Sequence, residues 1–263
     1  MSDAGAKINV KDIIILGSGR SGTSMVAGLF AQAGYFFGGT VYPPRDSNPK
    51  GFFETKAVND INEAILARIT ARRPPLIGSL LFRGRPGKSQ RWLARVPLNA
   101  EFPPDRVLSD KIKQLTARKP YCFKDPRFSY TLPVWRPWLD NTVFICVFRD
   151  PAVTVTSIIQ ECATARYLKD LRITPANALK VWSLMYSHIL QKHAGQGRWL
   201  FIHYDQVFDR HVLKKIAAMI DVEVDSSFPE KQLNRSTPGF PVDDKARGLY
   251  RRLCELADYK PRE

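Results

Sequence analysis

The 263-residue sequence predicts an α/β protein of three layers, in which helices flank a central, mainly parallel sheet. Two observations support this fold class. Apolar runs of strand length recur along the chain and alternate with segments whose apolar residues have helical spacing. These runs are almost uninterrupted by polar residues, which is typical of strands that helices cover on both faces.

The first predicted strand is the apolar run from Ile13 to Leu16. A glycine-rich turn follows at once, and after Gly22 apolar residues recur at helical spacing from Met25 onward. Gly34 supplies a stop signal, so we expect a helix that continues to about residue 33. The first unit is therefore a strand, a loop and a helix.

A second predicted strand runs from Val143 to Phe148 and ends at Arg149. Asp150 is a suitable N-cap and Pro151 suits the first position of a helix. Three later segments continue the alternation, namely a helix over 176–192, a strand over 199–203 and an amphipathic segment over 212–220.

No Gly/Ser-rich or Pro-rich linker divides the chain, so residues 1–263 are expected to form a single domain. The longest apolar runs are far shorter than a bilayer span, and the amino terminus lacks a cleavable leader pattern, which predicts a cytoplasmic protein. The four cysteines show no CxxC pairing, so we expect reduced thiols and neither a disulfide framework nor a zinc site.

Charge is the informative part of the composition, because 40 Lys and Arg against 25 Asp and Glu leave a net charge of +15. An anionic partner is expected. The basic window, residues 68–100, contains eight Lys and Arg and no acid. Its prolines and glycines predict a long irregular or mobile excursion outside the core.

The segment GSGRSGTS, from Gly17 to Ser24, lies between the first strand and the first helix. A loop in this position directs several backbone N–H groups toward one point, which suits a phosphate or a sulfate. The nucleotide-triphosphatase pattern requires Lys where this chain has Thr23, while a cation stands inside the loop as Arg20. A simple turn between strand and helix is the alternative interpretation.

A second constellation joins Arg149, at the end of a strand, to Ser157, which lies in the helix that follows. The two side chains could approach the same anion. The alternative is an arginine paired with a neighbouring acid and an ordinary surface serine.

Together, GSGRSGTS and FRDPAVTVTS resemble the paired loops of sulfotransferases that use 3′-phosphoadenosine 5′-phosphosulfate (PAPS). The resemblance implies a P-loop fold, PAPS as sulfuryl donor and 3′-phosphoadenosine 5′-phosphate (PAP) as product, with no metal required. It also implies that Arg149 and Ser157 hold the 3′-phosphate. The residues implied to hold the 5′-phosphosulfate are Arg20, Ser21, Gly22, Thr23 and Ser24.

A third stretch, LFIHYDQVF, is similar to the family's strand beside the adenine, which makes Tyr204 a candidate adenine contact; the alternative is a tyrosine that covers the core. The segments NPKGFFE and FKDPRFSYTLPVW resemble those of bacterial and carbohydrate-type members.

The resemblance makes three residues candidates for catalysis. Arg20 and Lys124 would stabilise charge at the transferred group, which carries a single formal negative charge. Glu54 is the candidate base, with a pKa raised by burial among its aromatic neighbours. The alternatives are an exposed Lys124 paired with Asp125, and a Glu54 that only complements the start of the next helix.

The resemblance implies transfer of a sulfuryl group to a hydroxyl, or to an amine, of a small molecule, a glycan or a glycolipid. The basic window would then attract an anionic glycan or lipid, or contact a membrane surface. A P-loop kinase or nucleotidase, and a basic module that binds an acidic polymer without catalysis, are the alternative functions. No nucleic-acid partner is expected, since no recognised motif for one is present.

Overall fold

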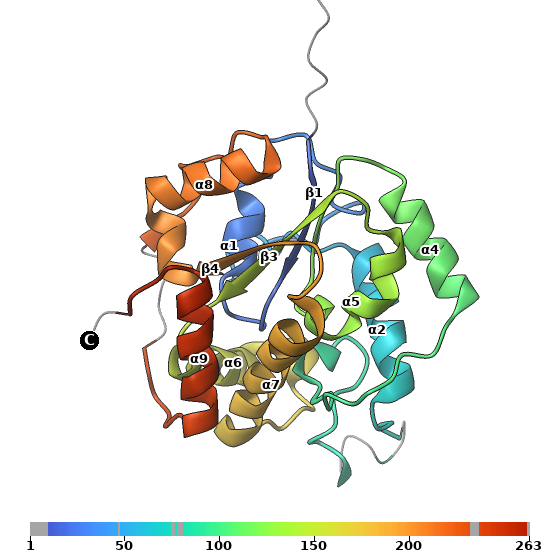
Figure 1. Cartoon of the computed structure of the whole chain (residues 1–263). Coiled ribbons are helices and arrows are strands. Elements are labelled where there is room, and N and C mark those ends of the chain that lie inside the picture. Colours follow the sequence, from blue (N-terminus) through green and yellow to red (C-terminus); the bar gives the residue numbers. More distant parts are fainter. Residues whose placement is uncertain (1–9, 47, 75–76, 78–80, 232–236, 262–263) are drawn as a thin grey trace, which may run out of the picture.

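The computed structural model describes residues 10–46, 48–74, 77, 81–231 and 237–261. Within these residues, four parallel strands form one sheet in the order β2-β1-β3-β4 (Figure 1). The strands are β1 (Asp12–Leu16), β2 (Cys122–Lys124), β3 (Thr142–Phe148) and β4 (Arg198–His203). Ile14 of β1 is in register with Phe123 on one side and with Phe144 on the other. Because all four strands run the same way, the loops at their carboxyl ends meet at one edge of the sheet.

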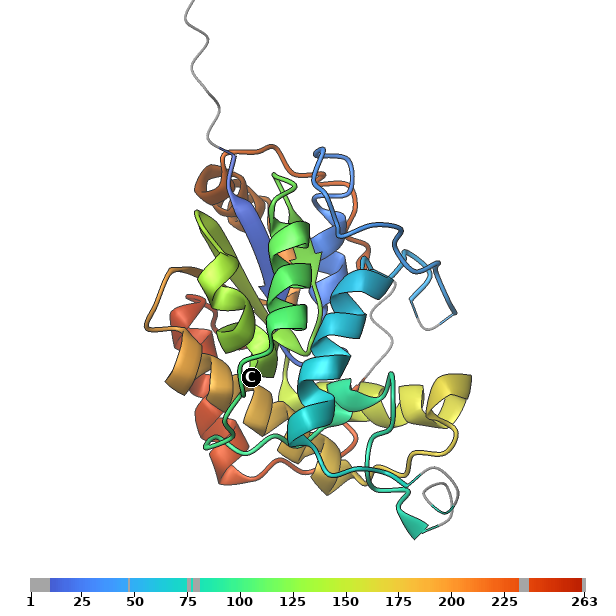
Figure 2. The same ribbon diagram turned by 90° about the vertical axis from the view of Figure 1, so that its right-hand side faces the viewer.

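Helices cover both faces of the sheet, so the predicted three-layer α/β fold is confirmed (Figures 1 and 2). Side chains alternate along each strand, and Ile13 and Ile15 therefore face one layer while Ile14 and Leu16 face the other. The first layer contains α1 (Thr23–Gly28) and α8 (Arg210–Ile220). The second contains α2 (Lys56–Ile69), α4 (Arg106–Thr116), α5 (Phe128–Trp135), α6 (Pro151–Thr164), α7 (Pro175–His188) and α9 (Asp244–Leu256).

The start of α6 confirms the prediction made for the end of the second apolar run. Asp150 is the N-cap, and its carboxylate accepts a hydrogen bond from the Val153 N–H at 3.0 Å. Pro151 occupies the first helical position, where its missing N–H has no cost. Arg149 is thereby fixed at the junction between β3 and α6.

The helix expected to continue to residue 33 is wrong beyond Gly28, where α1 ends. The chain continues as turns, in which Phe30 N–H donates to Ala27 and Ala33 N–H donates to Phe30. The Leu29 carbonyl accepts instead from the Asp225 N–H at 3.0 Å. A chain segment distant in sequence therefore ends the helix, and no local pattern could have predicted it.

The basic window is irregular, but the prediction that it lies outside the core is wrong for its second half. Trp92, Leu93, Ala94 and Val96 are all buried. A buried side chain also holds this stretch by a hydrogen bond, which the Tyr130 hydroxyl donates to the Ala94 carbonyl at 3.0 Å. Positions 75–76 and 78–80 of the window lie outside the described residues.

No helix among the described residues has both the length and the apolar character needed to cross a bilayer.

Candidate active site

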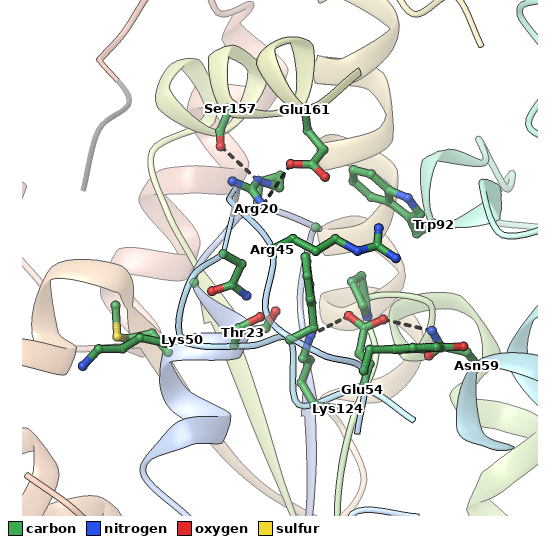
Figure 3. Close-up of a pocket in the computed structure, with 18 of the residues that line it drawn as sticks. Arg20, Thr23, Arg45, Lys50, Glu54, Asn59, Trp92, Lys124, Ser157 and Glu161 are labelled. Carbon is green, nitrogen blue, oxygen red and sulfur yellow. Dashed lines mark hydrogen bonds and ion pairs between the residues drawn. The ribbon is translucent and has the colours of Figure 1, made fainter. Parts of the chain in front are cut away.

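A cavity of about 710 Å³ lies at the edge of the sheet where the strands end (Figure 3). The segment that follows or completes each strand contributes to its wall: the loop after β1, Lys124 of β2, Arg149 after β3 and Tyr204 after β4. The predicted site residues that line it are Arg20, Gly22, Thr23, Ser24, Glu54, Lys124, Arg149, Ser157 and Tyr204. The structure thus brings together all of the predicted residues except Ser21.

Two glycines of the loop from Gly17 to Ser24 lie where another part of the chain leaves no room for a side chain. Gly17 has a φ of +141°, and a Cβ there would lie 2.1 Å from the Val147 carbonyl oxygen. Gly22 has a φ of +92°, and a Cβ there would lie 2.3 Å from the Tyr204 ring.

The N–H groups of Gly22, Thr23 and Ser24 lie at the start of α1, where a helix has no carbonyl for them to bond. Among the described residues, they donate to no protein acceptor. These groups are free to bind an anion.

Tyr186 of α7 anchors this loop from beneath. Its hydroxyl accepts from the Ser18 N–H at 3.1 Å, donates to the Val147 carbonyl at 2.8 Å and lies 3.0 Å from Ser21 Oγ. Burial raises the pKa of Tyr186, so the phenol keeps its proton. The Ser21 hydroxyl lies against Tyr186, and Ser21 is not among the residues that line the cavity.

Arg20 crosses from the loop to α6. Its backbone has a φ of +70°, its Nε donates to Ser157 Oγ at 3.1 Å, and its Nη1 lies 3.3 Å from Glu161 Oε2. Ser157 and Glu161 lie one turn apart on α6 and extend toward Arg20 from the same helix (Figure 3). The resemblance assigned Arg20 to the 5′-phosphosulfate and Ser157 to the 3′-phosphate, and in the structure the two side chains are hydrogen-bonded to each other.

Arg149 and Tyr204 form the neighbouring part of the wall. The guanidinium carbon of Arg149 lies 4.6 Å from the centre of the Tyr204 ring, which is a cation–π distance. Burial lowers the pKa of Arg149 from its ordinary value, but an arginine remains protonated at neutral pH. Gly22, Tyr204 and Arg149 thus pack in succession along one side of the cavity.

Lys124 and Glu54 form a buried ion pair elsewhere in the cavity, with Nζ 2.5 Å from Oε1. The second carboxylate oxygen of Glu54 accepts from Asn59 Nδ2 at 3.0 Å. Burial raises the pKa of Glu54, but the cations Lys124 and Arg127 outweigh that effect, and the pKa lies below its ordinary value. The expected upward shift is therefore wrong, because the prediction had no means of placing two cations beside this carboxyl group.

Comparison with known proteins places this arrangement in context. A model of the sulfotransferase family matches residues 12–226. The chain belongs to the sulfotransferase family. No curated protein sequence matches it.

Two solved structures resemble this sulfotransferase in fold. One is a sulfotransferase domain from the Synechococcus PCC 7002 olefin synthase, with 17% sequence identity, coverage of 95% of each chain and a TM-score of 0.50. The other is a sulfotransferase domain from the curacin biosynthetic pathway, with 14% identity, coverage of 96% of this chain and 99% of that one, and a TM-score of 0.53. At these identities the likeness concerns the fold.

A network of buried ions supports the Lys124 side of the sulfotransferase's cavity. Asp125 accepts from Arg127 Nη1 at 3.0 Å and from Asn62 Nδ2 at 3.0 Å, so the alternative of a Lys124 paired with Asp125 is wrong. Arg127 also donates through Nε to Glu63 at 2.9 Å. Glu63 in turn accepts from Arg91 Nη1 at 2.7 Å, which holds the basic window against α2.

An aromatic wall completes the sulfotransferase's cavity, and the sequence analysis missed it. Trp92 of the basic window packs on the loop from Gly17 to Ser24, since a Cβ on Gly19 would lie 2.4 Å from the Trp92 ring. The Arg45 guanidinium lies 5.7 Å from the Phe52 ring centre and 5.4 Å from that of Tyr167. These residues come from separate segments, and the resemblance of NPKGFFE to family members was the one signal near them.

Proposed function

We propose that this sulfotransferase moves a sulfuryl group from PAPS to a hydroxyl, or to an amine, of an acceptor and releases PAP. One observation carries the proposal. Two sets of hydrogen-bond donors, the N–H groups at Gly22 to Ser24 and the side chains of Arg149 and Ser157, belong to residues that line the same cavity. A ligand that carries two phosphate groups could engage both sets of donors.

The chemistry of the lining suits PAPS. Backbone N–H groups, a guanidinium and a serine hydroxyl all donate hydrogen bonds, and phosphate oxygens accept them. Arg149 and Ser157 would hold the 3′-phosphate, and Tyr204 beside Arg149 offers a ring for the adenine. The N–H groups at Gly22 to Ser24 would hold the 5′-phosphosulfate.

When bound, PAPS supplies an activated sulfuryl group, which the acceptor oxygen takes as the sulfur–oxygen bond to the 5′-phosphate breaks. Glu54 is ionised at neutral pH because its pKa is lowered, so it can receive the proton that the acceptor hydroxyl loses. Lys124, 2.5 Å from that carboxylate, places a fixed positive charge in the same region. Arg20 adds a second cation, so the proposed reaction requires no metal ion.

The acceptor in this proposal is a small molecule, a glycan or a glycolipid that bears the hydroxyl. It would lie against the aromatic wall, near the Glu54–Lys124 pair. The basic residues of the 68–100 window would favour an anionic acceptor or a membrane surface that presents one.

Calorimetric titration with PAP in EDTA tests the proposal, with ATP and Mg²⁺ as the comparison and adenosine 5′-phosphate as the matched control that lacks the 3′-phosphate. We expect metal-independent binding of PAP that is tighter than binding of either other nucleotide. Preference for ATP with Mg²⁺ would instead favour a kinase, and equal binding of PAP and adenosine 5′-phosphate would remove the role of Arg149 and Ser157.

A further inference from the structure

Glu161 is a carboxylate in a wall that otherwise attracts anions. It lies on α6 and lines the cavity, and its side chain is only 2% exposed. Its neighbours there are Arg20 and Ser157, with Arg149 in the same cavity. Burying a carboxylate is costly unless a cation accompanies it, and Arg20 Nη1 at 3.3 Å is such a cation.

This placement has two electrostatic effects on an anionic ligand. The carboxylate repels a phosphate group that approaches Ser157, and burial weakens the screening of that repulsion by solvent. The same carboxylate also neutralises Arg20, which bonds Ser157 through Nε at 3.1 Å. A ligand phosphate that contacts Arg20 must therefore share the guanidinium with Glu161.

We propose that Glu161 is a positioning residue that competes with the ligand's phosphate for Arg20. It holds the guanidinium on α6 and keeps the binding of PAPS and PAP weaker than the cations alone would make it. The inference rests on the proposed function. Because PAPS and PAP share both phosphate groups, a residue that weakens binding of both favours product release.

Glu161→Gln tests the proposal, since it removes the charge and nearly preserves the shape. We expect the Kd for PAP, measured by calorimetry, to fall about tenfold, because the repulsion disappears and the carboxylate no longer competes with the phosphate for Arg20. The dissociation rate of PAP, measured by stopped flow, should fall with it. A structural role alone would leave the Kd unchanged or raise it, and either result overturns the inference.

Asp46→Asn is the matched control, because Asp46 lines the same cavity but is exposed, and its loss changes the net charge equally. We expect less than about a twofold change in Kd, since solvent screens an exposed charge. An equal gain in both variants would show a general charge effect and overturn the proposal.

Thermal unfolding checks that Glu161→Gln is folded, and Glu161→Met serves as a second uncharged variant with the same expectation. Failure of the wild-type protein to bind PAP overturns both this inference and the proposed function. Binding by the wild type without tighter binding by the variants overturns this inference alone.

Discussion

The proposed phosphate-binding side of the cavity, which contains Arg20 and Arg149, and the Glu54–Lys124 side are both rich in charge, but the charges are arranged differently. On the first side, Arg149 lies against an aromatic ring and Arg20 shares its charge with one carboxylate. On the second, Lys124 is paired with Glu54, and Arg127 contacts both Asp125 and Glu63. The first side carries its positive charge on two arginines that line the cavity, whereas the second joins cations and carboxylates in a buried network. Substitutions on the first side should therefore alter mainly nucleotide binding, and those on the second should alter stability as well as the proposed catalysis.

Arg149→Ala should produce the largest effect on ligand binding. It removes a buried guanidinium that bonds the proposed 3′-phosphate, and loss of such a charged hydrogen bond costs about 3 kcal/mol, or more than about a hundredfold in Kd for PAP. Calorimetry measures this change. Arg149→Lys should recover part of the affinity, since it keeps the charge and loses the planar contact with Tyr204. If Arg149→Ala bound PAP with nearly the affinity of the wild type, this side of the cavity would not be the one that determines nucleotide binding.

Lys124→Met should lower the free energy of unfolding by about 3 kcal/mol at pH 7, because Glu54 then lacks its ion-pair partner. The pKa of Glu54 is lowered in the folded protein, so its contribution to stability is present above the ordinary carboxyl pKa and is lost as the pH falls through the folded pKa. Without Lys124 that pKa should rise, and the difference between variant and wild type should shrink at acid pH.

Urea denaturation at pH 7 and at pH 4 measures this difference. Glu54→Gln in the Lys124→Met chain is the matched control and should restore part of the stability, because no buried charge is left unpaired. A loss of stability that is independent of pH would show that packing, and not the ion pair, is the function of Lys124.

Gly19→Ala tests the contact between the loop and Trp92 of the aromatic wall, since the new Cβ would lie 2.4 Å from the Trp92 ring. Displacement of the ring or of the loop should cost about 1–3 kcal/mol of stability and about tenfold in PAP affinity. Denaturation and calorimetry provide the two values. Trp92→Leu in the same chain should restore the affinity, and no restoration would mean that the loop is distorted by the alanine itself.

Ser21→Ala should have the smallest effect on binding. The Ser21 hydroxyl bonds Tyr186 beneath the loop, so its loss should cost about 1 kcal/mol of stability and leave the Kd for PAP within about twofold. Ser24→Ala, at a position that lines the cavity, is the contrast and should weaken PAP binding more. Equal weakening by both would return Ser21 to the role that its sequence position suggested.

The phosphate-binding side could be predicted from the sequence because its parts are local. A strand, a glycine loop and a helix are consecutive in the chain, and Asp150 and Pro151 fix Arg149 at the start of α6. Parallel strands then bring such loops to one edge of the sheet. The predicted residues accordingly line one cavity, with Ser21 as the exception.

The other side could not be predicted, because its contacts join distant segments. The ion pair of Glu54 and Lys124 spans 70 positions, and the bond between Arg127 and Glu63 spans 64. The direction in which the pKa of Glu54 shifts depends on contacts of this kind. So does the burial of Trp92, which lies in a window whose composition predicted an excursion outside the core.

The hydrogen bonds of Tyr186 have a consequence for ligand selection. One phenol oxygen ties Ser18 of the loop to Val147, which lies two residues before Arg149. The loop after β1 and the junction between β3 and α6 are therefore held together by a buried side chain as well as by the pairing of β1 with β3. Under the proposed function, this fixed arrangement would select against a nucleotide whose phosphates are all attached at the 5′ position, because such a nucleotide would leave Arg149 and Ser157 without a phosphate to bind.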